Sequence, residues 1–320
     1  MGLGGEAPGP VAELIADRGA AAASDDFFRC SEFLAAEGVT DTLRIRAGDR
    51  IADVPLIVRE IPSSELRDAT SPYGYPGATV AGPGSPPAAA SVDWSATELV
   101  SVFGRERLAG ESWLADPPER SRVLVHDPAL PRRLRARLAE QIRANRRAGW
   151  SVEALTGRDA PEADRAGFAA AYTETMRRAG AAERYFFARS YLDAALSYER
   201  SWLLVARRGG ELGAAAIAAV SDSILHYFLG GTADAARRAS PFKNVVEAML
   251  DLADELGLPL NLGGGLAPGD GLEEFKRGFA NSGLAFSTQE VVCDAGEYGR
   301  LAGDAPAAGG FFPAYRAGLS

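Results

Sequence analysis

The feature that most constrains the fold is a set of three apolar, strand-like segments with almost no sequence between them. They span residues 201–207, 212–220 and 223–229, and they are separated by Gly209-Gly210 and Ser221-Asp222. Paired small or polar residues of this kind are turn signals, and strands joined by such short turns pair in antiparallel fashion. The segments therefore predict an antiparallel meander.

Helical and strand patterns continue on both sides of this meander. Phe168, Tyr172 and Met176 recur at helical spacing, and Gly180 is a stop signal. In chain order the second half predicts helices at 162–180 and 188–198, the meander, a helix at 240–257, a buried strand at 258–262, a helix at 271–280 and a strand at 284–292. This order is typical of the acetyltransferase-like (GNAT) fold, in which the junction after the meander holds an acyl donor.

The first half repeats the scheme more loosely. It predicts helices near 25–37, 95–109 and 131–148, and strands at 42–47, 51–61, 121–127 and 150–155. Residues 61–93 form a long connection, and a loop of this length is uncommon in a compact domain unless it has a function. We therefore expect this loop to be a binding surface.

The length of 320 residues fits two halves of similar size with mixed α/β sheets. We expect a mobile tail at 1–23, an acceptor-side half at 24–155, a donor and catalytic half at 156–303, and a C-terminal tail at 304–320. No apolar run approaches the roughly 20 residues that cross a bilayer, and the start of the chain lacks the pattern of a secretory signal. These features predict a soluble, cytoplasmic protein without a membrane partner.

Charged residues and cysteines limit the possible partners. The net charge of −9 disfavours DNA binding, which needs a basic surface. Cys30 and Cys293, placed in different halves, have no metal-ligand spacing, so we expect neither a disulfide nor a metal site. Lys243 and Lys276 are the only lysines among 34 basic residues. Lysine differs from arginine in losing its proton readily when buried, which makes both positions candidates, although codon drift explains Lys243 equally well.

Four segments together resemble the Fem-type branch of the GNAT superfamily. They are SPYGYPG at 71–77, HYFLGGT at 226–232, LGGG at 262–265 and LEEFKRGF at 272–279. The resemblance implies two tandem GNAT-like halves packed side by side. It also implies transfer of an amino acid from aminoacyl-tRNA to peptidoglycan precursors or peptide antibiotics. The chain has no heptad pattern, so we expect no coiled-coil arm.

The segment that opens the helix after the meander departs from the pattern of acetyl-CoA-dependent GNAT enzymes. Those enzymes use R/Q-x-x-G-x-G/A, whose bare amides bind pyrophosphate. The corresponding residues 237–242 (RRASPF) lack both glycines, and Pro241 removes a further amide donor. This favours aminoacyl-tRNA as co-substrate and predicts no cofactor, with coenzyme A required only under the alternative.

Lys276 is the leading catalytic candidate. The resemblance places it at the family's F-K-x-x-F position, where a lysine near the reacting carbonyl is implicated. Independently, Phe275 and Phe279 flank it at the start of a helix, a setting that would desolvate and aim its ammonium group. A surface lysine that extends past two core aromatics is the alternative. His226 is the candidate proton acceptor, against a structural histidine within an apolar strand.

The remaining candidates contact substrates. The substrate-binding residues are Tyr73, Tyr75, Tyr227, Gly230, Gly231, Thr232, Lys243, Asn244, Gly263, Gly264, Gly265 and Phe275. The two tyrosines of 71–77 line the acceptor pocket by resemblance, or else simply pack the loop. The glycines permit either close approach of a ligand or tight turns. Arg143, Arg146 and Arg147 lie on a basic helix that meets tRNA phosphates or is merely a solvated face.

These observations predict an aminoacyltransferase that joins an amino acid from aminoacyl-tRNA to an amine of a small peptide-like acceptor, in a cleft between the halves. Aminolysis of an activated ester needs positioning and preorganised donors rather than a covalent enzyme intermediate. An acyl-CoA-dependent N-acyltransferase and a non-catalytic binding module on the same fold remain the alternatives.

Overall fold

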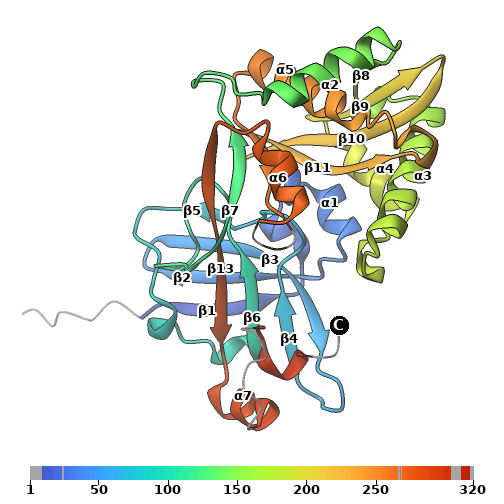
Figure 1. Cartoon of the computed structure of the whole chain (residues 1–320). Coiled ribbons are helices and arrows are strands. Elements are labelled where there is room, and N and C mark those ends of the chain that lie inside the picture. The colour runs from blue at the N-terminus through green and yellow to red at the C-terminus, as the bar shows by residue number, and fades with distance from the viewer. Residues whose placement is uncertain (1–8, 24, 266, 268, 304–310, 318–320) are drawn as a thin grey trace, which may run out of the picture. The chain divides into compact units, whose positions relative to one another are not determined.

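The computed structural model describes residues 9–23, 25–265, 267, 269–303 and 311–317, and it divides the chain into two compact units (Figure 1). Unit 1 comprises Met1–Ser24, Phe28–Arg120 and Phe286–Ser320, and unit 2 comprises Asp25–Phe27 and Ser121–Ala285. The division therefore falls at 120/121, whereas the expected boundary at 155/156 lies inside unit 2. Because the chain returns to unit 1 after Ala285, Cys30 and Cys293 belong to the same unit.

Unit 2 is built on a mixed sheet with the strand order β7-β12-β11-β10-β9-β8. These strands are β7 (Glu119–His126), β8 (Ser151–Thr156), β9 (Ser201–Arg208), β10 (Glu211–Ser221), β11 (Ile224–Thr232) and β12 (Leu260–Gly263). Strands β9, β10 and β11 form the predicted antiparallel meander, and β11 pairs with β12 in parallel. The meander is thus confirmed.

Helices cover both faces of this sheet. They are α2 (Ala136–Arg147), α3 (Glu162–Ala179), α4 (Arg189–Ser197), α5 (Phe242–Leu256) and α6 (Gly271–Arg277). Helix α5 packs on β8 to β11 and α3 packs on β10 and β11, because the row of alanines in β10 lets helices approach closely. Gly257 ends α5 in the left-handed conformation that the sequence predicts at this stop.

Unit 1 has the strand order β1-β2-β3-β4-β6-β13, with β5 paired to β3. Its strands are β1 (Val11–Ile15), β2 (Asp41–Ala47), β3 (Arg50–Glu60), β4 (Arg67–Thr70), β5 (Thr79–Ala81), β6 (Leu99–Arg105) and β13 (Ser282–Val292), the last of which begins in unit 2. Short helices α1 (Ser31–Ala36) and α7 (Ala295–Ala302) accompany them. The core of unit 1 includes Leu43, Val54 and Trp113.

Several segments of unit 1 differ from the sequence-based prediction. The prediction of a helix near 95–109 is wrong. Residues Leu99–Arg105 instead form strand β6, which pairs with β4 and β13. The expected loop at 61–93 contains β4 and β5, and part of the expected N-terminal tail forms β1, paired with β2. Near the C-terminus, Tyr315 and Arg316 bond to the buried Asp68. Every helix in the described part of the chain is too short or too polar to span a lipid bilayer.

Glu106 is a buried carboxyl group in unit 1. Its Oε1 accepts a hydrogen bond from Gln289 Nε2 at 3.1 Å, whereas its Oε2 has no partner among the described residues. Burial raises the pKa of Glu106 from 4.5 to about 7, against the lowering effect of the Gln289 bond. The folded chain therefore holds this proton more tightly than the unfolded chain does.

Glu106→Gln is expected to remove a pH dependence of stability. Because the folded pKa of Glu106 is raised, the free energy of unfolding falls by about 3 kcal/mol as the pH rises from 4.5 to 7. Urea unfolding of the wild type and the variant across this window measures the difference. An unchanged slope in the variant would assign the effect to another group.

Candidate functional site

The candidate site lies where β11 and β12 separate. The two strands pair only at Leu225↔Leu260 and His226↔Asn261. Strand β11 continues to Thr232 without β12 beside it, while the register of β12 against β7 shifts between Asn261 and Gly263. Among the described residues, the backbone at 227–232 therefore makes no β-pairing with the backbone at 263–265.

Lys276 extends from α6 toward this opening. Asp270 caps the helix by accepting a hydrogen bond from the Glu273 amide at 2.7 Å, which fixes the start of α6. The Lys276 side chain is only 9% exposed, and its Nζ donates to the Gly264 carbonyl at 2.8 Å and lies 5.6 Å from the centroid of the Tyr227 ring. The structure thus aims the ammonium group at the glycine run and not at bulk water.

The environment of Lys276 tunes its charge. Burial lowers the pKa of Lys276 to about 8, and the nearby charge of Asp270 opposes this effect. At pH 7 the Lys276 side chain is therefore still protonated in about 90% of the molecules. A desolvated cation with this pKa is suited to stabilise a developing negative oxygen.

The glycine run wraps closely around this helix. Gly263 has a φ of +76°, and a Cβ added there would lie 3.0 Å from Lys276 Nζ. A Cβ at Gly265 would lie 2.4 Å from an Asp270 carboxylate oxygen. Glycine at these positions permits both the left-handed turn and the close approach to α6.

A cluster of aromatic rings includes Tyr227, the ring that lies beside the Lys276 ammonium group. Ring centroids lie 5.7 Å apart for Tyr227 and Phe242, 6.4 Å for Phe242 and Phe275, and 5.3 Å for Phe275 and Phe279. A Cβ added at Gly230 would lie 2.6 Å from the Phe242 ring. The cluster brings together Tyr227, Gly230 and Phe275, three of the candidate substrate-binding residues.

His226 lies behind the glycine run in a hydrogen-bonded chain. Its Nδ1 accepts from Asn261 Nδ2 at 3.1 Å, and its Nε2 lies 3.4 Å from the Ser221 carbonyl, which can only accept. We therefore assign the neutral tautomer with the proton on Nε2. Asn261 Oδ1 in turn accepts from the Gly263 amide at 2.8 Å, so the chain orients the turn beside Lys276.

This arrangement favours a positioning role for His226 over the predicted role of proton acceptor. Its side chain is buried, and burial lowers its pKa from 6.5 to about 4, so the imidazole is neutral at pH 7 with Nδ1 already engaged. A general base needs a free lone pair that faces the substrate. Asn261 is a residue of the candidate site that the sequence-based prediction missed, although a polar residue within the apolar run LPLNL is a visible signal.

His226→Gln is expected to keep turnover within about tenfold of wild type, whereas loss of a general base costs roughly 10²–10⁴-fold. Because the folded pKa of His226 is lowered, the wild type should lose about 3 kcal/mol of stability as the pH falls from 6.5 to 4. Unfolding curves of both proteins over this range test this expectation. A hundredfold loss of turnover in a folded variant would restore the general-base role.

Two predicted binding residues hold helix α3 instead. A Cβ added at Gly231 would lie 2.5 Å from the Tyr172 backbone nitrogen. The Thr232 amide donates to Thr175 Oγ1 at 2.9 Å, and the Thr232 carbonyl accepts from Arg178 Nη2 at 2.8 Å. The backbone of this end of β11 is thus committed to packing against α3.

Asn244 lies between two helices. Its Oδ1 accepts from Asn145 Nδ2 at 2.8 Å, and its Nδ2 donates to the Ile142 carbonyl at 3.2 Å. Lys243, its neighbour in α5, is partly buried, and burial together with the positive charge of Arg137 lowers its pKa. The structure therefore gives Asn244 a role in joining α2 to α5.

The basic helix α2 is largely ion-paired. Glu140 pairs with Arg143 and Arg147, each at 2.9 Å, and Glu247 pairs with Arg146 at 2.7 Å. Two carboxylates already pair with these three arginines and offset most of their charge, which weakens the prediction that they meet tRNA phosphates.

Tyr73 and Tyr75 lie in unit 1. Tyr75 makes edge-to-face contacts with Phe28 and Phe286, at centroid distances of 5.6 and 5.2 Å. Tyr73 is 40% exposed, and its amide donates to Glu37 at 2.7 Å. Tyr75 thus packs the loop, and Tyr73 presents the more accessible ring.

Several backbone amides at the start of α5 are already hydrogen-bonded. Its first turn is closed by bonds from the amides of Lys243 to Ser240 O at 3.3 Å and of Asn244 to Pro241 O at 2.9 Å. In the preceding segment, the amides of Ala236, Arg237, Ala239 and Ser240 also donate to carbonyls of residues 233–237. Amides that are already bonded cannot grip a pyrophosphate in the way a glycine-rich loop does.

One family model matches part of the chain. Residues 132–277, which include α2, α5 and α6 with Lys276, are similar to the family described as an acetyltransferase (GNAT) domain. The opening between β11 and β12 lies within these matched residues. No sequence among the curated proteins matches the chain significantly.

Solved structures share the fold over most of the chain. The crystal structure of FemX has a TM-score of 0.59 at 12% identity, covering 85% of this chain and 93% of that chain. The C-terminal domain of a proposed lysylphosphatidylglycerol synthetase from Agrobacterium fabrum has a TM-score of 0.54 at 12% identity, covering 85% and 88%. A conserved protein of unknown function from Bacteroides thetaiotaomicron has a TM-score of 0.52 at 10% identity, covering 85% and 93%. The predicted mixed α/β fold, similar to that of FemX, is confirmed, and residues 132–277 carry the predicted likeness to GNAT domains.

Proposed function

We propose that this GNAT protein is an aminoacyltransferase that forms an amide bond between an amino acid carried by tRNA and an amine of a small peptide-like acceptor. The observation that carries the proposal is the buried ammonium of Lys276 beside the separated strands β11 and β12. The likeness of the fold to FemX supports the Fem-type assignment.

The reaction requires an uncharged amine to attack the ester carbonyl of aminoacyl-tRNA. A carbon–nitrogen bond forms, and the carbonyl oxygen becomes negatively charged. The ester carbon–oxygen bond then breaks, the amine loses a proton, and the ribose oxygen gains one. One N–H of Lys276 Nζ donates to the Gly264 carbonyl. The ammonium group supplies the positive charge and a further N–H for the oxyanion.

The donor preference follows from the start of α5. Acyl-CoA enzymes bind pyrophosphate with free backbone amides, whereas here those of Lys243 and Asn244 close the first helical turn. The left-handed Ser240, with a φ of +50°, and Pro241 replace the glycines of that loop. These features favour an RNA-borne ester over coenzyme A as the donor.

The acceptor is proposed to contact unit 1. Tyr73 offers an accessible ring and hydroxyl for a peptide-like molecule, of the kind found in peptide antibiotics and cell-wall precursors. Use of charged tRNA would place the reaction in the cytoplasm.

The test incubates the purified protein with radiolabelled aminoacyl-tRNA and candidate peptide amines, with and without RNase. We expect a labelled amide product that RNase abolishes. A product formed from acyl-CoA and unaffected by RNase, with thermal stabilisation by coenzyme A, would replace the tRNA donor. Tight binding of the acceptor without turnover on any donor would indicate a binding module.

A further inference from the structure

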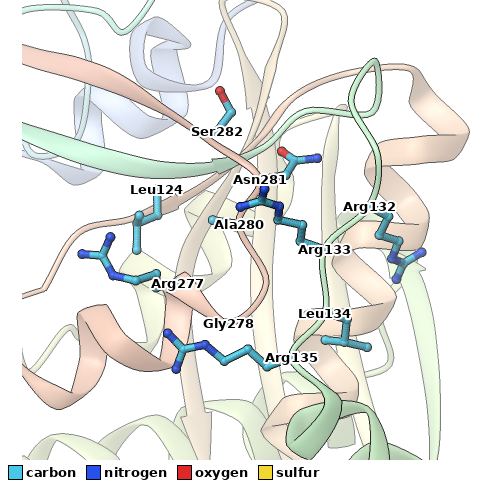
Figure 2. A pocket seen from close by; sticks show the side chains of 10 residues that line it. All are labelled: Leu124, Arg132, Arg133, Leu134, Arg135, Arg277, Gly278, Ala280, Asn281 and Ser282. Atoms are coloured by element: carbon cyan, nitrogen blue, oxygen red, sulfur yellow. The ribbon is translucent and has the colours of Figure 1, made fainter.

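A cavity of about 740 Å³ lies in unit 2 on the outer side of the loop at 127–135 (Figure 2). Its lining residues are Leu124, Arg132, Arg133, Leu134, Arg135, Arg277, Gly278, Ala280, Asn281 and Ser282. Arginines make up four of these positions, and no aspartate or glutamate is among the described residues that line it. The cavity is thus lined by guanidinium groups, although Arg132, Arg135 and Arg277 each also pair with a carboxylate outside the lining.

The walls of the cavity are held by hydrogen bonds. Asn281 Oδ1 accepts from the Asp127 amide at 2.7 Å, and Asn281 Nδ2 donates to the Asp127 carbonyl at 2.9 Å. At the other end of the loop, the Arg135 amide donates to the Gly278 carbonyl at 3.1 Å. The loop and the turn after α6 are therefore tied together at both ends, which gives the cavity a preorganised shape.

The arginines differ in their partners. Arg132 pairs with Asp251 at 2.7 Å and points away from the hollow in Figure 2. Arg135 pairs with Glu274 at 3.1 Å, and Arg277 pairs with acidic residues of its own helix. Arg133 is exposed and has no carboxylate partner within the described chain, and Figure 2 shows its side chain beside the hollow that Arg135 and Arg277 also border. Its charge is the one least compensated at this cavity.

The cavity adjoins the proposed catalytic residue. Arg277 follows Lys276 in α6, and since consecutive helical side chains point about 100° apart, the two side chains leave neighbouring sides of the helix. Leu124, on the cavity wall, is paired with Gly263 beside Lys276 Nζ. A flexible chain that presents its end to Lys276 therefore has this cavity within reach of its next units.

We propose that this cavity binds phosphodiester groups of the single-stranded 3′ end of the donor tRNA, an inference that rests on the proposed function. The planar guanidinium fork matches two phosphate oxygens at once, which makes arginine the preferred side chain for phosphate. Leu124 and Leu134 supply apolar surface for a ribose or base. The cavity holds the nucleotides that precede the terminal aminoacylated ribose, and it orients the ester toward Lys276.

The test measures the binding of a fluorescent RNA oligonucleotide ending in CCA by anisotropy at several salt concentrations. Arg133→Ala is expected to weaken binding about fivefold to tenfold and to reduce the slope of log K against log salt by about 0.7 to 1. Arg200→Ala, which removes the same charge from an exposed turn before β9, is the matched control and should bind like wild type.

Equal binding by wild type and the Arg133 variant would overturn the cavity assignment, and so would coenzyme A binding that depends on Arg133 when the RNA does not bind. Failure of the cavity assignment can be distinguished from failure of the proposed function. If transfer is RNase-sensitive but the Arg133 variant binds RNA like wild type, only the cavity assignment is wrong. Arg133-dependent RNA binding without any transfer supports the cavity and removes the aminoacyltransferase proposal.

Discussion

Lys276→Ala is expected to lower the single-turnover rate of amide formation by about 10²–10³-fold, the usual cost of removing one preorganised donor at an oxyanion. The structure gives the reason, because Lys276 Nζ is the buried cation beside the separation of β11 and β12. Rapid mixing of the enzyme with charged tRNA and acceptor amine, followed by quantification of labelled amide, measures the loss.

Two controls separate catalysis from folding. A thermal melt should show a folded Lys276→Ala protein, since loss of a partly compensated buried charge does not demand unfolding. Lys276→Arg should recover only part of the rate, because the planar guanidinium is larger than the ammonium that fits against Gly264. Full turnover in the alanine variant would exclude Lys276 from the mechanism.

Gly263→Ala is expected to reduce turnover by about fivefold to tenfold, with Lys276 still present. The new Cβ would lie 3.0 Å from Lys276 Nζ, so the lysine would have to shift its ammonium group by a few tenths of an ångström. Because misplacement of a catalytic group by about 1 Å costs up to roughly 10²-fold, this smaller shift is expected to cost correspondingly less. Single-turnover assays of the folded variant measure the effect.

Gly257→Ala is the matched control for this substitution. Gly257 also has a left-handed φ, +65°, but a Cβ added there meets no atom within 4 Å. The control should therefore lose about 1 kcal/mol of stability from backbone strain and keep its turnover. Equal rate losses in the two variants would show that strain alone, and not the contact with Lys276, causes the defect.

The second half of the chain was readable from its sequence because its signals are local. Tight turns specify the meander, and Gly180 and Gly257 end α3 and α5 where predicted. Strand β6 was not readable, because it depends on pairing with β4 and with the distant β13. The return of the chain to unit 1 after Ala285 carries no local signal either.

Sequence reasoning could predict those parts of the candidate site that lie within one short motif. Lys276 and Phe275 belong to a single helix segment, whereas Tyr227 and Phe242 of the aromatic cluster come from β11 and α5. The roles of Thr232 and Asn244 depend on contacts with α3 and α2, which lie 57 and about 100 residues away along the chain. No sequence pattern at those two positions distinguishes a residue that packs a helix from one that binds a ligand.

The most direct test of the account is a crystal structure with a stable analogue of the donor end, an adenosine whose 3′ amide replaces the aminoacyl ester. We predict the carbonyl oxygen of the analogue within about 3 Å of Lys276 Nζ, the distance required of an oxyanion donor. An analogue bound elsewhere in unit 2, or a Lys276 side chain turned outward to solvent, would contradict the central claim.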